Sequence, residues 1–294
     1  MPMTTFRQIR AAIEQLDPGE VRGTAERPVV IRLTASGAES YARMEAFLAP
    51  PTLSRAKRMD SLGSLYRDGE QGAPDRADIE IFEAGWPRPD GGFVFDGSRR
   101  MRLVEDILEA KQDLGLPLAR AFPPFRRDVC DRIIFNISKE NALLAIMTAL
   151  PDLAPGLAIP WMIPEAATDA AVLTVNQIRM AFLLAAASDR QVGYREQKAE
   201  VASIIAGAFG WRALARELAS KIPLGGGILP KAGIAFAGTF VEGRSLERLY
   251  RLGYSYTRSE RKLAYGEAFA RGREVAARLL DAARRRGPNP PRST

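Results

Sequence analysis

The side chains that carry most enzyme chemistry are scarce in this sequence. Its 294 residues include no histidine and one cysteine, Cys130. Without an imidazole, no Ser-His or Cys-His pair can form, and the commonest metal ligand is missing. Cys130 lies among apolar residues of an expected helix, which favours a small buried side chain over an activated thiol. We therefore expect no catalytic residue, no metal site and no cofactor.

Carboxylates near one expected strand are the remaining candidates for acid and base chemistry. Asp78, Glu80 and Glu83 lie on and just after the strand segment DIEIFE, residues 78–83. Two carboxylates in different environments can serve as an acid and a base. The alternation of these residues with apolar ones predicts solvent exposure instead.

A turn after the first expected strand is the best candidate for binding an anion. Residues 27–35, RPVVIRLTA, are typical of a buried strand, and Ser36, Gly37 and Ser40 follow at the start of an expected helix. Backbone N–H groups at a helix N-terminus point toward an anion, and the helix dipole favours negative charge there. A capped helix without a ligand explains the same residues. Both interpretations stay open.

Three amides, Asn141, Asn176 and Gln177, stand among apolar neighbours in the second half of the chain. A buried amide without a partner costs about 1–3 kcal/mol. We therefore expect each of them to bond across helices or to cap one.

The positions of the apolar residues predict an α+β protein, because an α/β part is followed by helices alone. The first part has expected helices at 5–16, 39–48 and 99–114, strands at 27–35 and 78–83, and loops at 49–76 and 87–97. The second has expected helices at 125–150, 166–188, 195–209, 211–221 and 229–254. We divide the chain into a small α/β unit, 1–120, a helical domain, 121–257, and a basic C-terminal helix and tail, 258–294.

Residues 142–164 form the most apolar stretch of the chain. Proline breaks it into pieces that are too short to cross a bilayer singly, so a bent hairpin is expected. Such a hairpin either dips into a membrane or folds back as core. A face of small residues on the last expected helix of the helical domain would let another helix approach closely. The candidates for membrane or partner contact are Leu153, Leu157, Ile159, Trp161, Lys231, Ala235, Thr239 and Gly243.

The positive charge is concentrated near the C-terminus. The net charge is +7, and residues 244–294 contain 13 Lys and Arg against 5 Asp and Glu. Acids are followed by bases four residues on, as on a solvated helix. These pairs are Glu267 with Arg271, Glu274 with Arg278 and Asp281 with Arg285. An anionic membrane or partner is the alternative explanation, and nucleic acid is not expected because no motif for binding it accompanies the charge.

The segments LTVNQIRMAFLLAAASDR, GWRALARELASKIP and GGGILPKAGIAFAGTFVEGR contain a further pattern. Its residues are Thr174, Asn176, Gln177, Gly210, Trp211, Ala215, Arg216, Pro230, Lys231, Gly238, Thr239 and Gly243. Residues 122–251 resemble the C-terminal helical domain of unknown function shared by YcjF-like proteins and some bacterial Era-type GTPases. In that family the domain often follows a P-loop GTPase domain, is associated with membranes and has no established catalytic role.

This resemblance calls for a comparison of the N-terminal unit with a GTPase, whose phosphate loop has the pattern G-x-x-x-x-G-K-[ST]. The first strand is followed by SGAES, residues 36–40, with one glycine and no lysine, and Glu39 would repel a triphosphate. Ala84 and Gly85 are similar to part of a D-x-x-G turn, but no N-K-x-D motif occurs. We interpret the unit as P-loop-like, degenerate and shortened.

Together these patterns favour a non-catalytic, membrane-associated accessory or interaction protein. The alternative is a nucleotide-binding switch or hydrolase with a non-standard phosphate loop. The expected partner is an anionic membrane surface or a membrane protein, and a GTPase or a second copy of the chain is a further option. The lone cysteine and the charged first twenty residues predict the cytoplasmic side of the cell membrane, or the cytoplasm.

Overall fold

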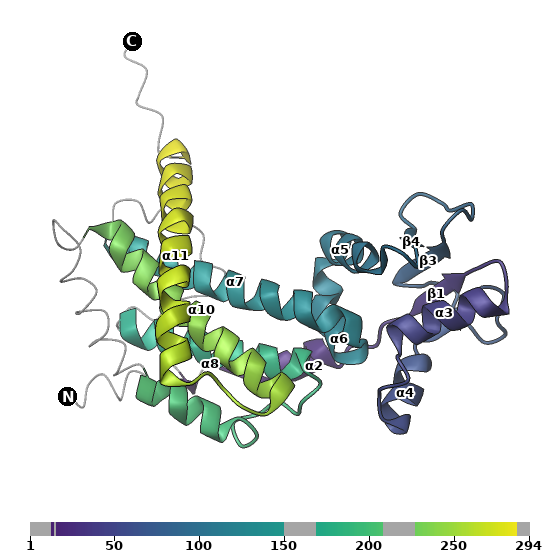
Figure 1. Cartoon of the computed structure of the whole chain (residues 1–294), viewed down its shortest axis with the longest axis horizontal. Coiled ribbons are helices and arrows are strands. Elements are labelled where there is room, and N and C mark those ends of the chain that lie inside the picture. The colour runs from purple at the N-terminus through teal and green to yellow at the C-terminus, as the bar shows by residue number, and fades with distance from the viewer. Residues whose placement is uncertain (1–12, 15, 150–168, 208–226, 287–294) are drawn as a thin grey trace, which may run out of the picture. The chain divides into compact units, whose positions relative to one another are not determined.

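The computed structural model describes residues 13, 14, 16–149, 169–207 and 227–286 (Figure 1). They form two compact units. The α/β unit comprises Gly19–Arg132 and Ala185–Val192, and the helical unit comprises the described parts of Met1–Pro18, Ile133–Leu184 and Gly193–Thr294. One unit contains a small parallel sheet with helices, and the described part of the other is helical. This confirms the α+β class.

Four short parallel strands form the sheet of the α/β unit, in the spatial order β2-β1-β3-β4. They are β1 (Ile31–Thr34), β2 (Leu65–Arg67), β3 (Ile79–Glu83) and β4 (Phe93–Phe95). The helical elements of this unit are α2 (Pro18–Ala25), α3 (Ala38–Leu48), α4 (Arg55–Leu62), α5 (Arg100–Ala110), the 3-10 turn η1 (Gln112–Leu114), α6 (Gly115–Ala121) and the start of α7 (Pro123–Met147). The strand β1 is central, because Ile31 aligns with both Leu65 and Ile79.

Fully buried apolar side chains connect the sheet to its helices. In the two central strands they are Ile31, Leu33, Ile79 and Ile81, and in α3 and α5 they are Met44, Leu48, Leu103 and Ile107. Helix α3 contacts β1 and α5 contacts β4. Burial of each such side chain contributes about 1.5–3 kcal/mol. The core thereby fixes the positions at which β1 and β3 end.

The expected helices at 39–48 and 99–114 and the strands at 27–35 and 78–83 correspond to α3, α5, β1 and β3, with shorter bounds for both strands and for α5. The expectation of loops at 49–76 and 87–97 was wrong, because these segments contain α4, β2 and β4. Strands β2 and β4 have three residues each, which is too short for a periodic pattern in the sequence. Helix α4, RAKRMDSL, is short and strongly polar, so its sequence predicts a loop. Its start is set by Ser54, whose hydroxyl oxygen accepts the Lys57 N–H over 3.3 Å.

The helical unit is built from long helices. They are the second part of α7, α8 (Asp169–Ala187), a helix over 198–207, α10 (Ile228–Leu252) and α11 (Arg258–Arg286). Helices α10 and α11 form a tightly packed hairpin (Figure 1). An ideal Cβ on Gly272 of α11 would lie 3.0 Å from the carbonyl oxygen of Gly233 in α10. Most of the expected helix 5–16 and all of 211–221 lie outside the described residues.

The described part of the apolar stretch, 142–149, contributes to the core of the helical unit. Ala142, Ala145 and Ile146 are buried in one cluster with Phe236 and Leu280. Residues 150–164 lie outside the described part of the chain, so lipid contact by that part of the expected hairpin stays a prediction. In the described ranges, no helix is both long enough and apolar enough to span a bilayer.

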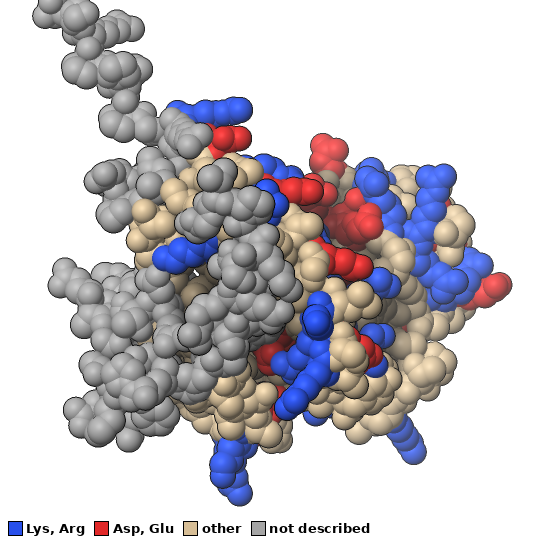
Figure 2. Space-filling view, turned by 60° about the vertical axis from the view of Figure 1, so that its left-hand side comes forward, with Lys and Arg blue, Asp and Glu red and all other residues tan. Residues whose placement is uncertain are grey.

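The basic residues of α11 have mixed partners. Of the three expected pairs on this helix, the described residues contain one, Glu274 with Arg278 at 3.6 Å. Arg271 instead lies over the rings of Phe135 and Phe240, at 5.0 and 5.4 Å from their centroids. Figure 2 shows basic and acidic side chains interspersed on the described surface of one face.

Candidate functional site

The carboxyl ends of β1 and β3 lie side by side at the point where the chain reverses direction across the sheet. From β1 it runs through α3 and α4 to β2 on one side, and from β3 it runs to β4 on the other. In open α/β sheets, ligands bind at such a switch point. The predicted anion-binding residues Ser36, Gly37 and Ser40 lie at this point, and so does Glu83, the last residue of β3.

The Glu83 carboxylate occupies the turn after β1. Ser36 donates its backbone N–H and its hydroxyl to Glu83 Oε2, over 2.9 and 2.6 Å. The Ser40 hydroxyl donates to Oε1, and Arg43 Nη2 lies 3.3 Å from the same oxygen. Gly37 is the N-cap residue of α3 and has an extended backbone. The donors of Ser36 and Ser40 therefore bind an anion that belongs to the chain itself.

These donors lower the pKa of Glu83 to about 2. The largest cause is the Ser36 hydroxyl, followed by the Ser40 hydroxyl and the Ser36 N–H, whereas burial acts in the opposite direction. At neutral pH Glu83 is ionised, so it accepts hydrogen bonds and has no proton to donate. Its negative charge also repels a phosphate at the same place. The arrangement is suited to holding a turn closed rather than to acid catalysis.

The other two carboxylates of this strand segment have separate partners. Asp78 Oδ2 accepts the Val30 N–H over 2.9 Å, and Glu80 Oε1 accepts a hydrogen bond from Arg32 over 3.0 Å. Each of them therefore joins neighbouring strands. Asp78, Glu80 and Glu83 therefore do not form the acid and base pair considered from the sequence.

A hollow of about 530 Å³ lies beside the carboxyl end of β2. It is lined by Glu45, Leu62, Leu65, Arg67, Asp68, Gly69 and Glu70. Arg67 donates to Glu45 over 2.8 Å and lies over the Tyr41 ring, and the Glu45 hydrogen bond is the main cause of its raised pKa. Because one arginine faces three acids, this hollow does not suit a phosphate. Neither in this hollow nor elsewhere in the described ranges is a group of three or more His, Cys, Asp and Glu placed to hold a metal ion.

The amides of the helical unit join three of its helices. Asn141 of α7 donates to the Thr239 hydroxyl of α10 over 2.7 Å, and Asn176 of α8 donates to Asn141 over 2.7 Å. Gln177 lies 3.4 Å from the same hydroxyl, which itself donates to the Ala235 carbonyl. Asn176 Oδ1 is buried and has no partner among the described residues. These bonds confirm the expectation that the amides connect helices.

The predicted contact residues fall into two groups. Leu153, Leu157, Ile159 and Trp161 lie outside the described residues. Thr239 and Gly243 are buried, and a Cβ on Gly243 would lie 2.9 Å from both Ile134 of α7 and Met180 of α8. Ala235 is partly buried against the same core, and Lys231 is exposed with its Nζ 3.2 Å from the Thr148 hydroxyl. The small-residue face of α10 therefore packs against this chain's own helices.

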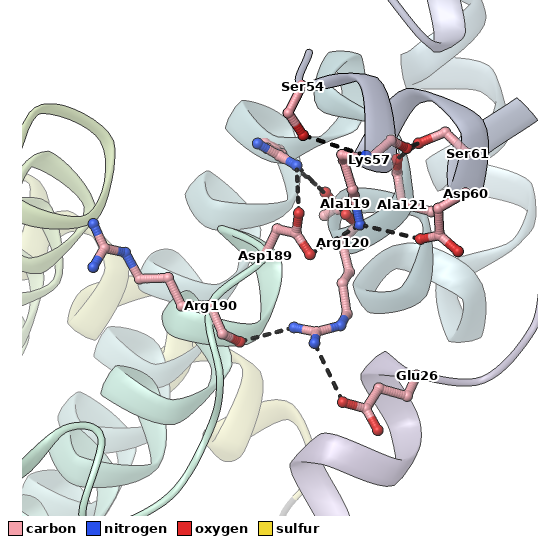
Figure 3. Close-up of polar contacts among 11 residues, drawn as sticks. Glu26, Ser54, Lys57, Asp60, Ser61, Ala119, Arg120, Ala121, Asp189 and Arg190 are labelled. Atoms are coloured by element: carbon pink, nitrogen blue, oxygen red, sulfur yellow. Dashed lines mark hydrogen bonds and ion pairs between the residues drawn. The ribbon is translucent and has the colours of Figure 1, made fainter.

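A second polar cluster, which the sequence did not indicate, surrounds Asp189 (Figure 3). Asp189 pairs with Lys57 at 2.9 Å and with Arg126 at 3.5 Å. Arg120 donates to the Arg190 carbonyl over 2.8 Å. All these residues belong to the α/β unit, so the cluster attaches the segment Ala185–Val192 to the rest of that unit. Its charges are paired with one another, and its role is structural.

No protein-family model, no curated protein and no solved structure matches this chain. The resemblance to the YcjF-like helical domain therefore depends on the sequence segments that carry it and stays a hypothesis. Its residues Gly210, Trp211, Ala215 and Arg216 lie outside the described part of the chain. Within the described part, Asn176 and Thr239 belong to one hydrogen-bonded group through Asn141.

Proposed function

We propose that this protein is a non-catalytic accessory or interaction protein that associates with the cytoplasmic side of a membrane. The observation that carries the non-catalytic part is the position of Glu83. Its carboxylate accepts hydrogen bonds from the hydroxyls of Ser36 and Ser40 and from the Ser36 N–H. These bonds lie at the switch point, where an open α/β sheet would bind a ligand. This contact also supports the interpretation of the α/β unit as a degenerate P-loop-like unit.

Membrane association is supported by the chain's charge and by its apolar stretch. Residues 244–294 hold the excess of basic residues, and anionic lipid attracts such a segment. The part of the apolar stretch beyond the described core, 150–164, has only one charged residue, Asp152. The resemblance to a membrane-associated domain points in the same direction.

Nucleotide binding tests the non-catalytic part of the proposal. Calorimetric titration of the full chain with GTP and with ATP, each with Mg²⁺, should show no binding at micromolar concentrations. The variant Glu83→Ala is the informative comparison, because it frees the hydroxyls of Ser36 and Ser40. Submicromolar binding by the unaltered chain would establish the alternative, a nucleotide-binding switch, and would overturn the proposal.

Fractionation of cells tests the membrane part. The full chain should sediment with membranes, and washing the pellet with high salt and then with alkaline carbonate separates surface attachment from insertion. A deletion should be confined to 151–164, because Ala142, Ala145 and Ile146 belong to the core. If the chain stays entirely in the supernatant at low salt, the membrane part of the proposal is wrong.

A further inference from the structure

The connection between α10 and α11 has an unusual exposed surface. We define the hairpin tip as residues 251–263, which comprise the end of α10, the connecting turn and the first turns of α11. Large apolar side chains are exposed here: Leu252 at 47%, Tyr254 at 54% and Leu263 at 74%. Elsewhere in the helical unit, α10 and α11 bury their apolar residues against each other and against α7.

The backbone of the tip is held in one conformation. Gly253 ends α10 with a left-handed φ of 86°, as expected at a helix C-terminus. Thr257 and Glu260 form a capping box at the start of α11, since the Thr257 N–H donates to Glu260 over 2.8 Å and the Glu260 N–H donates to the Thr257 hydroxyl over 3.3 Å. Arg248 pairs with Glu260 at 2.6 Å and lies over the Tyr254 ring at 4.6 Å. The exposed residues thus protrude from a rigid turn.

The free charge of the tip is positive. Arg251, Arg258 and Lys262 are exposed, and none of them forms an ion pair or a side-chain hydrogen bond with the residues that the structure describes. Glu260, the only acid in the tip sequence, is paired with Arg248, which holds its pKa at about 2. Arg261 is paired with the buried Glu242 at 3.0 Å. The thirteen residues of the tip therefore combine three exposed cations that have no partner in the described ranges with three exposed apolar side chains.

Apolar side chains flanked by unpaired cations suit an anionic lipid surface. Leucine and tyrosine enter the boundary between headgroups and acyl chains, while arginine and lysine remain at the headgroups. Each cation near such a surface contributes an attraction of about 1 kcal/mol. An acidic protein would satisfy the cations equally well, but the exposed apolar side chains beside them, with Leu263 at 74%, favour a lipid surface.

We propose that the hairpin tip is the surface by which this protein docks onto anionic lipid. This inference rests on the proposed membrane association and adds where the contact is and which lipid it prefers. It does not depend on residues 150–164.

The test is flotation of the full chain with vesicles of phosphatidylcholine containing about 30 mol% phosphatidylserine, compared with phosphatidylcholine alone. Arg251→Glu, Arg258→Glu and Lys262→Glu together should lower partitioning onto the anionic vesicles by about 100-fold or more. A second variant, Leu263→Ser with Leu252→Ser, should lower it by about 10-fold or more without changing the charge.

The matched control changes the charge equally in the α/β unit, at the exposed residues Arg55, Arg76 and Arg99, each replaced by Glu. This control should keep more than half of the original binding, and circular dichroism checks that all variants fold. If the full chain floats and the tip variants float equally well, the tip is not the docking surface although membrane association stands. If the full chain floats with neither vesicle and instead binds polyglutamate, the lipid proposal is overturned and an acidic protein partner takes its place.

Discussion

At the scale of single residues, the candidate site is decided by one carboxylate. Ser36 and Ser40 have the side chains and the place at a helix start that suit an anion, as their sequence positions predict. What the sequence did not reveal is that Glu83, more than forty positions later, supplies this anion from the neighbouring strand. The signal was present, because the carboxyl ends of adjacent parallel strands meet at one edge of a sheet. A sequence does not show which strands are adjacent.

The low pKa of Glu83 makes the fold sensitive to acid. A carboxylate whose pKa is about 2 in the folded state and about 4.3 in the unfolded chain stabilises the fold fully above pH 5, and this contribution is lost as the pH falls toward 2. NMR titration of the Glu83 side chain should give this low value. Replacement of Ser36 by Ala, which removes the largest cause, should raise it toward the ordinary range. The same titration in Ser98→Ala is the control. A Glu83 pKa near 4 in the unaltered chain would show that the turn is open in solution.

Asp189 has an unusual backbone conformation for a residue with a side chain. It has a φ of 60°, and the N–H groups of Asp189 and Arg190 donate to the carbonyls of Ala186 and Ala185, which is the pattern of a Schellman motif. A residue with a side chain costs about 1–2 kcal/mol in this left-handed conformation. Glycine usually fills this position. The ion pairs with Lys57 and Arg126 compensate for that cost.

Two substitutions at Asp189 separate the backbone from the ion pairs. Both Asp189→Ala and Asp189→Gly remove the carboxylate, but only the glycine relieves the left-handed backbone. We expect Asp189→Ala to be less stable than Asp189→Gly by about 1 kcal/mol in urea unfolding. Equal stability of the two variants would mean that the ion pairs alone determine the conformation of this turn.

At the scale of elements, the sequence predicted those with a long periodic pattern. Helices α3, α8 and α10 were expected close to their observed bounds, and α5 was expected with a later end, because each has apolar residues over several turns. The short strands β2 and β4 and the polar helix α4 were missed, since their stability comes from neighbours that are distant in the sequence. For the same reason, the small-residue face of α10 was detected, whereas its partners in α7 and α8 were not.

Close contact between α10 and α11 predicts opposite effects of alanine at two glycines of α11. A Cβ on Gly272 would lie 2.9 Å from the Phe236 Cβ and 3.0 Å from the Gly233 carbonyl oxygen, whereas a Cβ on Gly266 would meet nothing within 4 Å. Gly272→Ala should lower the free energy of unfolding of the helical unit by about 1–3 kcal/mol. Gly266→Ala should raise it by roughly 0.5–1 kcal/mol, because alanine favours the helix. Thermal and urea unfolding measure both. Stabilisation by both substitutions would show that the hairpin is more loosely packed than its glycines indicate.

At the scale of the whole molecule, the two compact units do not follow each other along the chain. The α/β unit is completed by Ala185–Val192, which the chain reaches only after most of α8. Within this unit Arg22 donates to the Val192 carbonyl over 2.6 Å, and Lys57 pairs with Asp189. A division of the chain at one position near residue 120 separates these partners. The periodicity of a sequence predicts helices and strands, but it does not show that a later segment packs back onto an earlier unit.

A fragment of residues 16–132 should therefore be less stable than the same unit within the full chain. It would lack the acceptors of Arg22 and Arg120 and the carboxylate that pairs with Lys57. The expected loss is about 1–3 kcal/mol, because Arg22 loses its acceptor and the half-buried Arg120 and Lys57 keep only their partners Glu26 and Asp60. Urea unfolding followed by NMR signals of Ile31 and Ile81 measures it in both proteins. A synthetic peptide of residues 183–194 should restore part of the loss, and the same peptide with Asp189→Ala should restore less. Equal stability of fragment and full chain would mean that the returning segment adds nothing to the α/β unit.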